Sequence, residues 1–133
     1  MKVKIYTDGG ARGNPGPAAT GIVIKNEQGD LLASYGEYLG EQTNNFAEYS
    51  GIISALQKAS ELGVSEAECF LDSKLVVEQL NGKWKIKEPT LQKLFVKAYN
   101  ASAKLKKVTY KHIYREDNKE ADALVNETLD KNI

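Results

Sequence analysis

The hydrophobic positions change their period along the chain, and the change predicts the order of the elements. Apolar and polar residues alternate over residues 2–8, and further strands are expected over residues 18–25 and 31–39. Glycine and proline gather in residues 9–17, and residues 26–29 are polar and end in glycine. Both segments are expected to be turns, so the first third of the chain predicts an antiparallel meander.

A helical period follows the third strand. Thr43, Asn44 and Asn45 carry side chains that cap helices, and apolar residues then recur every three or four positions until Gly63. The remaining elements are expected over residues 68–72 (strand), 73–80 (helix), 90–105 (helix), 108–114 (strand) and 118–129 (helix). Strands followed by alternating strands and helices predict an α/β fold with parallel strand–helix–strand units.

Length and composition are typical of one globular domain. The chain has 133 residues, 41% hydrophobic and 27% charged, and no apolar run approaches the roughly 20 residues of a membrane helix. We therefore expect residues 1–133 to form a single domain. We also expect a monomer, since no exposed apolar stripe suggests a partner. The alternating opening predicts a strand rather than a leader peptide, which favours a cytoplasmic protein.

The residues available for chemistry narrow the reaction type. One cysteine, Cys69, and one histidine, His112, cannot supply an internal disulfide or an ordinary zinc site. No serine or cysteine stands beside a histidine base, so a covalent nucleophile is not predicted. Any metal is expected on oxygen ligands.

The net charge of zero hides a segregation of charge. Residues 82–111 contain nine lysines and one acid, Glu88, whereas residues 26–72 contain nine acids and one base, Lys58. A lysine-rich segment that includes Trp84 suits a polyanionic partner such as nucleic acid. A solvated lysine face on a helix explains the same pattern without a partner.

Four acids occupy unusual positions. Asp8 and Asp72 are expected at the carboxyl ends of strands, where α/β proteins bind ligands and where neighbouring strands lie about 4.8 Å apart. Glu48 falls on the apolar stripe of its helix, and Asp122 lies at the edge of the stripe of the last helix. Taken singly, Glu48 and Asp122 could be first-turn acids that favour the helix dipole, and Asp72 could be an N-cap.

Together the four acids predict a divalent-metal site. Carboxylates on adjacent strands repel unless a cation lies between them, and Mg²⁺ and Mn²⁺ prefer carboxylate oxygen. Two such ions about 4 Å apart support in-line phosphoryl displacement by water. The glycine turn lacks the spacing of nucleotide-binding loops, and its glycines, with Arg12 and Asn14, are expected to approach a sugar-phosphate chain.

Four segments follow one another in an order specific to one enzyme family. They are Tyr6-Thr7-Asp8-Gly9-Gly10 with Gly13-Asn14-Pro15-Gly16-Pro17, Thr43-Asn44-Asn45-Phe46-Ala47-Glu48, Leu71-Asp72-Ser73, and Asn118-Lys119-Glu120-Ala121-Asp122. The pattern resembles type 1 ribonuclease H, in the short form without an N-terminal hybrid-binding domain, over almost the whole chain. The resemblance implies a ribonuclease H-like α/β fold, a five-stranded mixed sheet with antiparallel strands 1–3 and parallel strands 4–5, flanked by helices.

The resemblance also implies an enzyme that cuts the RNA strand of RNA/DNA hybrids internally and leaves 5′-phosphate and 3′-hydroxyl ends. By the family pattern, two Mg²⁺ ions, or Mn²⁺ as a substitute, would be held by Asp8, Glu48, Asp72 and Asp122. Asp8 would bridge the two ions. Glu48 would also lie near the 2′-hydroxyl beside the scissile phosphate, the group that separates RNA from DNA.

The resemblance further implies contacts to the hybrid. The glycine turn and Asn14, Asn44 and Asn45 would meet the minor groove, and Thr43 would help hold a DNA phosphate. The full set of substrate-binding candidates is Gly9, Gly10, Arg12, Asn14, Thr43, Asn44, Asn45, Ser73, Trp84 and Arg115. The amides of Asn44 and Asn45 could instead cap the helix.

The chain departs from the family in two places. Many bacterial members carry a histidine in the loop before the last aspartate, whereas residues 114–118 contain none, and Arg115 is expected to steady a phosphate or the leaving group instead. Longer members insert a basic helix, for which residues 82–87 would be a reduced handle, with Trp84 against a sugar and the lysines on DNA phosphates. Trp84 could instead cover the edge of the core.

Two other functions fit part of the pattern. Exonucleases of the same fold usually carry a glutamate two residues after the first aspartate, where this chain has Gly10. A hybrid-binding module without catalysis needs the basic surface but has no need of four acids. The acids therefore favour the nuclease.

Overall fold

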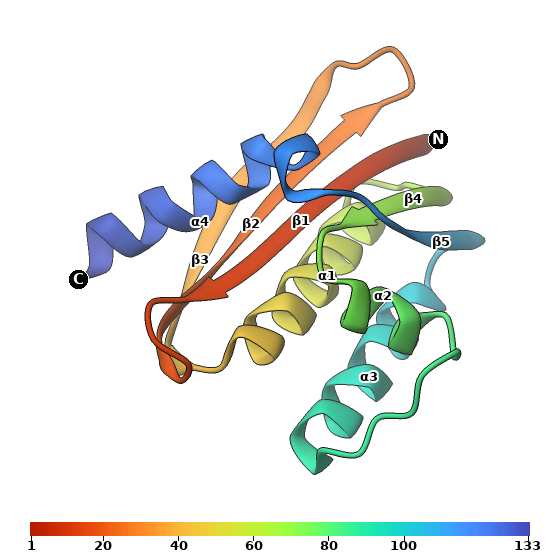
Figure 1. The fold of residues 1–133 in the computed structure, drawn as a ribbon. Coiled ribbons are helices and arrows are strands. Elements are labelled where there is room, and N and C mark those ends of the chain that lie inside the picture. The colour runs from red at the N-terminus through yellow and green to blue at the C-terminus, as the bar shows by residue number, and fades with distance from the viewer.

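The computed structural model describes residues 1–133, which form one mixed sheet with helices on both faces (Figure 1). The elements are β1 (Lys2–Ala11), β2 (Gly16–Asn26), β3 (Leu31–Gln42), α1 (Asn44–Glu61), β4 (Glu66–Leu71), α2 (Lys74–Leu80), α3 (Pro89–Ser102), β5 (Lys107–His112), the short 3-10 helix η1 (Arg115–Asp117) and α4 (Lys119–Asn132). The strand order is β3-β2-β1-β4-β5. Strands β1, β2 and β3 pair antiparallel, and β4 is parallel to both β1 and β5, which confirms the predicted architecture.

The first hairpin differs from the prediction. Strand β1 does not end at Asp8 but continues to Ala11, and its partner β2 begins at Gly16, so only residues 12–15 form the tip instead of residues 9–17. Gly9 and Gly10 have extended partners in β2, at Thr20 and Ala19. Glycine weakens a strand by itself, but here pairing with β2 outweighs that cost.

The helices divide between the two faces of the sheet (Figure 1). Strand β1 alternates, and its inward residues Val3 and Ile5 join α1, α2 and α3 in a cluster of 21 buried residues. Helix α4 packs on the opposite face, where Val125 and Leu129 meet Ala19 of β2 in a separate small cluster. None of the helices combines the length and hydrophobicity that a membrane crossing requires.

Hydroxyl side chains cap the two helices that border the predicted site. The Thr43 Oγ1 accepts a hydrogen bond from the Phe46 amide at 3.1 Å, and the Ser73 Oγ accepts one from Val76 at 3.3 Å. The alternatives that assigned these caps to Asn44, Asn45 or Asp72 are therefore wrong. The asparagine and aspartate side chains are left for other contacts.

Gly9 sets the distance between β1 and α1. A Cβ atom added at Gly9 would collide with the backbone of Ala47 and Glu48, whereas one added at Gly10 would meet only a methyl group of Val125 at 3.6 Å, an ordinary contact. Only glycine allows the two backbones to come this close. The position of Glu48 beside β1 depends on it.

This packing predicts opposite outcomes at two adjacent glycines. We expect Gly9→Ala to lower the free energy of unfolding by about 1–3 kcal/mol or more, because backbone must move to admit the methyl group. Gly10→Ala should change it by less than about 0.5 kcal/mol, as for sites without a special conflict. Urea unfolding followed by circular dichroism measures both, and equal effects of the two variants would contradict the close-approach explanation.

Candidate active site

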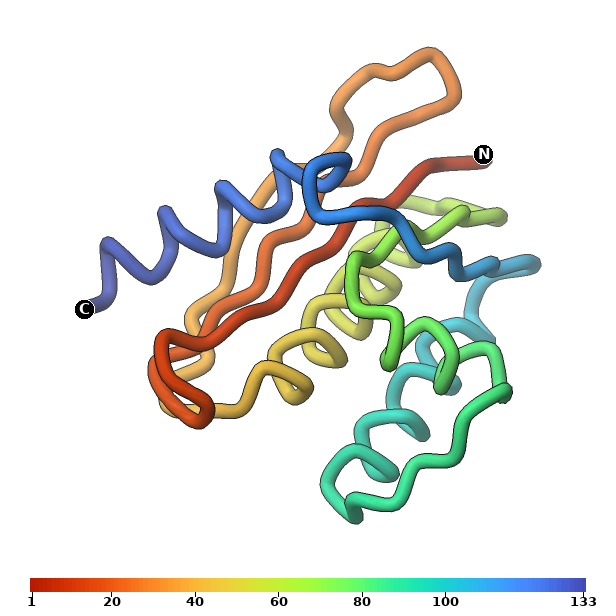
Figure 2. The backbone as a smooth tube through the Cα atoms, in the orientation of Figure 1, coloured from red at the N-terminus to blue at the C-terminus, as the bar shows by residue number.

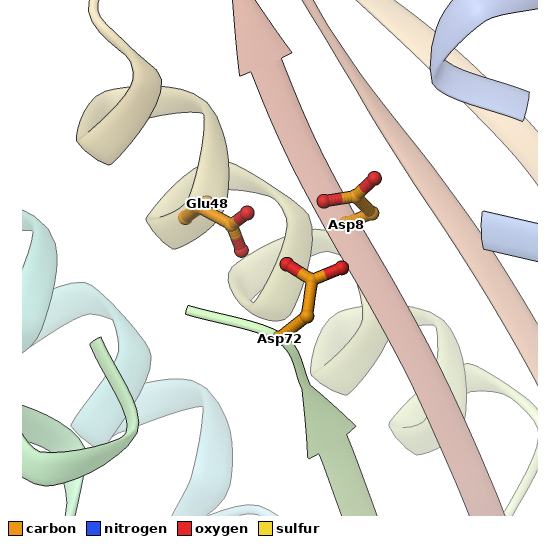
Figure 3. Close-up of side chains that lie close together, drawn as sticks. All are labelled: Asp8, Glu48 and Asp72. Carbon is orange, nitrogen blue, oxygen red and sulfur yellow. The ribbon is translucent and has the colours of Figure 1, made fainter. Parts of the chain in front are cut away.

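The predicted site lies where the pairing between β1 and β4 ends. The last paired residues are Thr7 and Leu71. Asp8 is the next residue within β1, and Asp72 is the first residue after β4. Asp8 and Asp72 therefore lie side by side at the point where these two parallel strands part. Figure 3 shows these two side chains close together.

Glu48 completes a cluster of three carboxylates. It lies in the second turn of α1, not the first, so the first-turn explanation for this acid is wrong. Glu48 is 6% exposed and Asp8 is 7% exposed, and one oxygen from each of Asp8, Glu48 and Asp72 lies within 4.8 Å of the other two. The structure thus brings three of the four predicted acids into one group (Figure 3).

Few hydrogen bonds compensate these buried oxygens. The Gly9 amide donates to Asp8 Oδ1 at 2.9 Å and to Glu48 Oε1 at 3.3 Å. The second oxygen of Glu48, Oε2, is buried without any hydrogen-bond partner. A buried acceptor without a donor is costly.

Burial and repulsion raise the pKa values of the cluster. Burial, and then the negative charge of Asp72, raise the pKa of Asp8 to about 7. Burial also raises the pKa of Glu48 well above its usual range, and the charges of Asp8 and Asp72 add to this effect. Strongly raised carboxyl pKa values in a cleft mark candidate functional sites.

The donor set fits a divalent metal. Three carboxylates offer hard oxygen ligands, which Mg²⁺ and Mn²⁺ prefer, and the unpaired Oε2 of Glu48 is the atom that gains most from a cation. A bound ion would also offset the repulsion that raises the pKa of Asp8. The cluster is therefore a candidate metal centre.

Asp122 lines the same cleft but is not part of the group of three. The cleft has a volume of about 440 Å³, and it is bordered by all four acids together with Gly9, Gly10, Arg12, Asn44, Asn45, Ser73 and Arg115. The Asp122 Oδ1 accepts a hydrogen bond from the Arg115 guanidinium at 3.3 Å. Arg115 thus faces an acid of the site, as well as solvent.

A second hollow of about 300 Å³ adjoins the cleft at Asn45. Its other lining residues are Asn14, Thr43, Glu88 and Leu91, so it lies between the first hairpin, the start of α1 and the start of α3. Two of the candidates assigned to the hybrid, Asn14 and Thr43, meet here rather than in the main cleft.

Asn44 and Arg12 are engaged by the protein itself. The Asn44 Oδ1 accepts a hydrogen bond from the Ala11 backbone amide at 2.8 Å, and the Asn44 backbone amide donates to Asn14 Oδ1 at 3.0 Å. These two bonds fasten the hairpin to α1. The Arg12 guanidinium forms an ion pair with Asp130 at 2.7 Å. Neither contact was predicted, because each joins segments far apart in the sequence.

Trp84 and the lysines lie outside both hollows. The segment after α2 runs as an extended loop beside α3 (Figure 2), and Trp84, on this loop, is 45% exposed and is not one of the buried residues of the core. This exposure favours a contact with a partner over the alternative in which Trp84 covers the core edge. All nine lysines of residues 82–111 are exposed, and only Lys111 lies within ion-pair distance of an acid, Glu68.

Asn118 is a site residue that the sequence analysis missed. Its side-chain amide is buried and donates to Asp72 Oδ2 at 3.1 Å and to the Thr7 carbonyl at 2.8 Å. An asparagine directly before a helix ordinarily indicates an N-cap, so position alone gives no hint of this role. The available signal was its place at the start of the motif that ends at Asp122.

Comparisons with known proteins agree with this fold. A family model described as reverse transcriptase-like matches residues 6–128. The ribonuclease HI of Halobacterium salinarum is 41% identical over 97% of this chain and 65% of its own length, and the crystal structure of ribonuclease H1 from this archaeon superposes with a TM-score of 0.96 at 40% identity, over 98% of this chain and 99% of that one.

Two further relatives point the same way. LC11 ribonuclease H1, solved in complex with an RNA/DNA hybrid, has a TM-score of 0.92 at 46% identity and covers 97% of both chains. The bifunctional protein Rv2228c of Mycobacterium tuberculosis is 45% identical over 98% of this chain, which spans only 36% of that protein's length. The chain belongs to the type 1 ribonuclease H family.

The raised pKa values predict an unusual pH dependence of stability in the metal-free protein. Folded Asp8 keeps its proton up to about pH 7, whereas unfolded Asp8 loses it near the ordinary value of 3.8. The folded state therefore binds more protons between these values, and this contribution to stability is lost as pH rises from about 4 to about 7. We expect the loss to reach about 1–3 kcal/mol.

Asp8→Asn isolates the effect from other titrating groups. The free energy of unfolding of the wild-type protein and of Asp8→Asn is measured by urea unfolding in the presence of a chelator. The difference, wild type minus variant, should fall as pH rises from 4.5 to 7.5. Mn²⁺ at pH 7.5 should stabilise the unchanged protein more than the variant. A difference that stays constant with pH would show that the pKa of Asp8 is not raised in the folded protein.

Proposed function

We propose that this chain is an endoribonuclease that hydrolyses the RNA strand of RNA/DNA hybrids with two divalent metal ions and leaves 5′-phosphate and 3′-hydroxyl ends. The observation that carries the proposal is the group formed by the buried Asp8 and Glu48 with the half-buried Asp72, in which one oxygen of each lies within 4.8 Å of the others. Family membership and the hybrid complex of a relative that is 46% identical support the substrate.

Asp8, Glu48, Asp72 and Asp122 would hold the ions, which we expect to be Mg²⁺ with Mn²⁺ as a substitute. When bound, two such ions would activate a water and stabilise the departing oxygen. Asp8 would bridge the two ions, and its place in one group with Glu48 and Asp72 supports this role. Asp122 would exchange its contact with Arg115 for a metal, which frees the guanidinium for a phosphate or the leaving group.

The residues around the acids would position the hybrid. Asn14 and Thr43 share a hollow with Asn45, which also borders the main cleft, so a duplex crossing both could place one strand at each. Thr43 keeps its proposed contact with a DNA phosphate, and Glu48 its proposed place beside the 2′-hydroxyl. Gly9, which is buried, would act by admitting α1, and Gly10 and Ser73 border the cleft and remain binding candidates.

The lysine-bearing loop would extend the binding surface. Lys83, Lys85 and Lys87 are exposed and make no ion pair, so their charges are free for DNA phosphates. Trp84 lies among them and is exposed enough to meet a sugar. We expect residues 1–133 to carry out this function as one domain and as a monomer.

The test is a cleavage assay on an end-labelled RNA/DNA hybrid, with Mg²⁺ or Mn²⁺, beside duplex DNA and duplex RNA. We expect internal cuts in the RNA of the hybrid that are lost with chelator. Asp8→Asn should lower kcat by about a hundredfold or more, the usual scale for losing one group that stabilises a transition state. Asp30→Asn, an exposed aspartate on the far hairpin, is the matched control and should leave kcat unchanged.

Two outcomes would contradict the proposal. Hybrid binding without cleavage in either metal would indicate a binding module and leave the acids unexplained. Products that carry a 3′-phosphate, detected by their failure to be extended by a polymerase, would contradict the proposed ends.

Trp84→Ala tests the loop. We expect it to weaken hybrid affinity about fivefold to tenfold, corresponding to about 1 kcal/mol, and to shift the melting temperature by less than about 2 °C because Trp84 is not part of the core. Fluorescence anisotropy in an Asp8→Asn background measures affinity without cleavage. Tyr38→Ala, which removes an exposed aromatic on β3, is the control, and a large melting loss with normal affinity would refute the assignment.

A further inference from the structure

Asn118 joins three segments of the site through one side chain. It is 2% exposed and stands directly before α4. Its Nδ2 atom donates to the carbonyl of Thr7, the residue before Asp8, at 2.8 Å, and to Asp72 Oδ2 at 3.1 Å. Both partners can only accept, so the orientation of the amide is dictated by chemistry.

The same residue fixes the start of the helix that carries Asp122. The Asp122 amide donates to the Asn118 carbonyl at 3.1 Å, which forms the first turn of α4. The Asn118 side chain makes no capping hydrogen bond to α4, although asparagine is among the best N-caps. Asn118 therefore contributes less to its helix than it could, and its donors serve the site instead.

The arrangement also leaves an unsatisfied atom. The Oδ1 of Asn118 is buried and has no hydrogen-bond partner. A buried polar atom without a partner lowers stability, so a residue chosen only for stability would not be expected here. The local cost is explained if the donors of the amide are needed.

The contact with Asp72 suits an ionised metal ligand. The amide carries no charge, so it can hold one oxygen of Asp72 without competing electrostatically with a cation for the carboxylate. Arg115 makes the opposite kind of contact with Asp122, because its charge opposes a cation at that acid. Outer partners that orient a metal ligand typically affect metal affinity about 10–100-fold.

We propose that Asn118 is a positioning residue that orients Asp72 and holds the start of α4, and with it Asp122, against β1, and that it thereby sets the affinity of the site for divalent metal. The inference rests on the proposed function, since it concerns the same site. Asn118 acts through Asp72 and the α4 backbone rather than by touching the substrate.

Asn118→Ser separates this role from a structural one. Serine is a strong N-cap and should keep or raise the stability of α4, but its hydroxyl is too short to reach Asp72 and Thr7 together. Isothermal titration of the metal-free protein with Mn²⁺ should show an affinity about 10–100-fold lower. Under fixed Mn²⁺, kcat should fall while KM for the hybrid changes less than about twofold, since no substrate contact is lost.

Two further variants complete the test. Asn118→Ala should lose affinity similarly and also lose stability, and if it does not fold, the serine variant still decides. Asn132→Ala removes an exposed amide in the last turn of the same helix, which donates to the Thr128 carbonyl at 2.7 Å, and should leave Mn²⁺ affinity unchanged.

The outcomes distinguish this inference from the proposed function. Mn²⁺ affinity within twofold of the unchanged protein in folded Asn118→Ser would overturn the positioning role, even if hybrid cleavage is observed. An unchanged protein that neither binds Mn²⁺ nor cuts the hybrid would instead refute the proposed function, and the positioning role with it. Loss of Mn²⁺ affinity together with a normal melting temperature supports the inference.

Discussion

Asp8, Glu48 and Asp72 come from three different elements, yet their oxygens approach within 4.8 Å of one another. Like charges at this distance repel, and burial removes the water that would screen them. Side chains on a yielding scaffold would separate. The arrangement persists because the backbones that carry the acids are fixed independently of them. The sheet holds the two central strands, and the absence of a side chain at Gly9 allows α1 to pack closely against β1.

The topology explains why the acids meet at this place. Strands β1 and β4 are the central parallel pair, and their hydrogen-bonded ladder stops at Thr7 and Leu71. Beyond it β1 continues along β2, whereas the chain after β4 turns into α2. The two strands therefore part at the point where each carries an aspartate, and the opening between them is where Glu48 arrives from α1. Where the hydrogen bonding between two central strands ends, the site is held by a rigid sheet and is also open to a ligand.

Much of this could be predicted from local patterns. Asp8 and Asp72 follow apolar segments with the period of a strand, and Glu48 interrupts an apolar helical stripe, so each is visible within a few residues of sequence. The extension of β1 through Gly9 and Gly10 could not be predicted in this way, because glycine normally indicates a turn. Whether a strand can include glycine depends on the strands that pair with it. The contacts of Asn118 and the ion pair of Arg12 with Asp130 could not be predicted from the sequence for a related reason. These contacts join residues that are more than a hundred positions apart, or elements whose relative placement the hydrophobic periodicity does not specify.

The distribution of charge links the site to the rest of the surface. A polyanion approaching the metal-free centre would meet carboxylates that already repel one another, and it would raise their pKa values further. The exposed lysines after α2 lie outside the cleft and make few ion pairs, so they attract phosphate without neutralising the acids. In the proposed function, the lysines would attract the nucleic acid and the acidic cleft would carry out the reaction, so the two tasks fall to different surfaces. A net charge of zero is therefore compatible with strong binding of nucleic acid. Under the proposed function, the backbone of the hybrid would be held first, and cations at the acids would then permit the scissile phosphate to approach them.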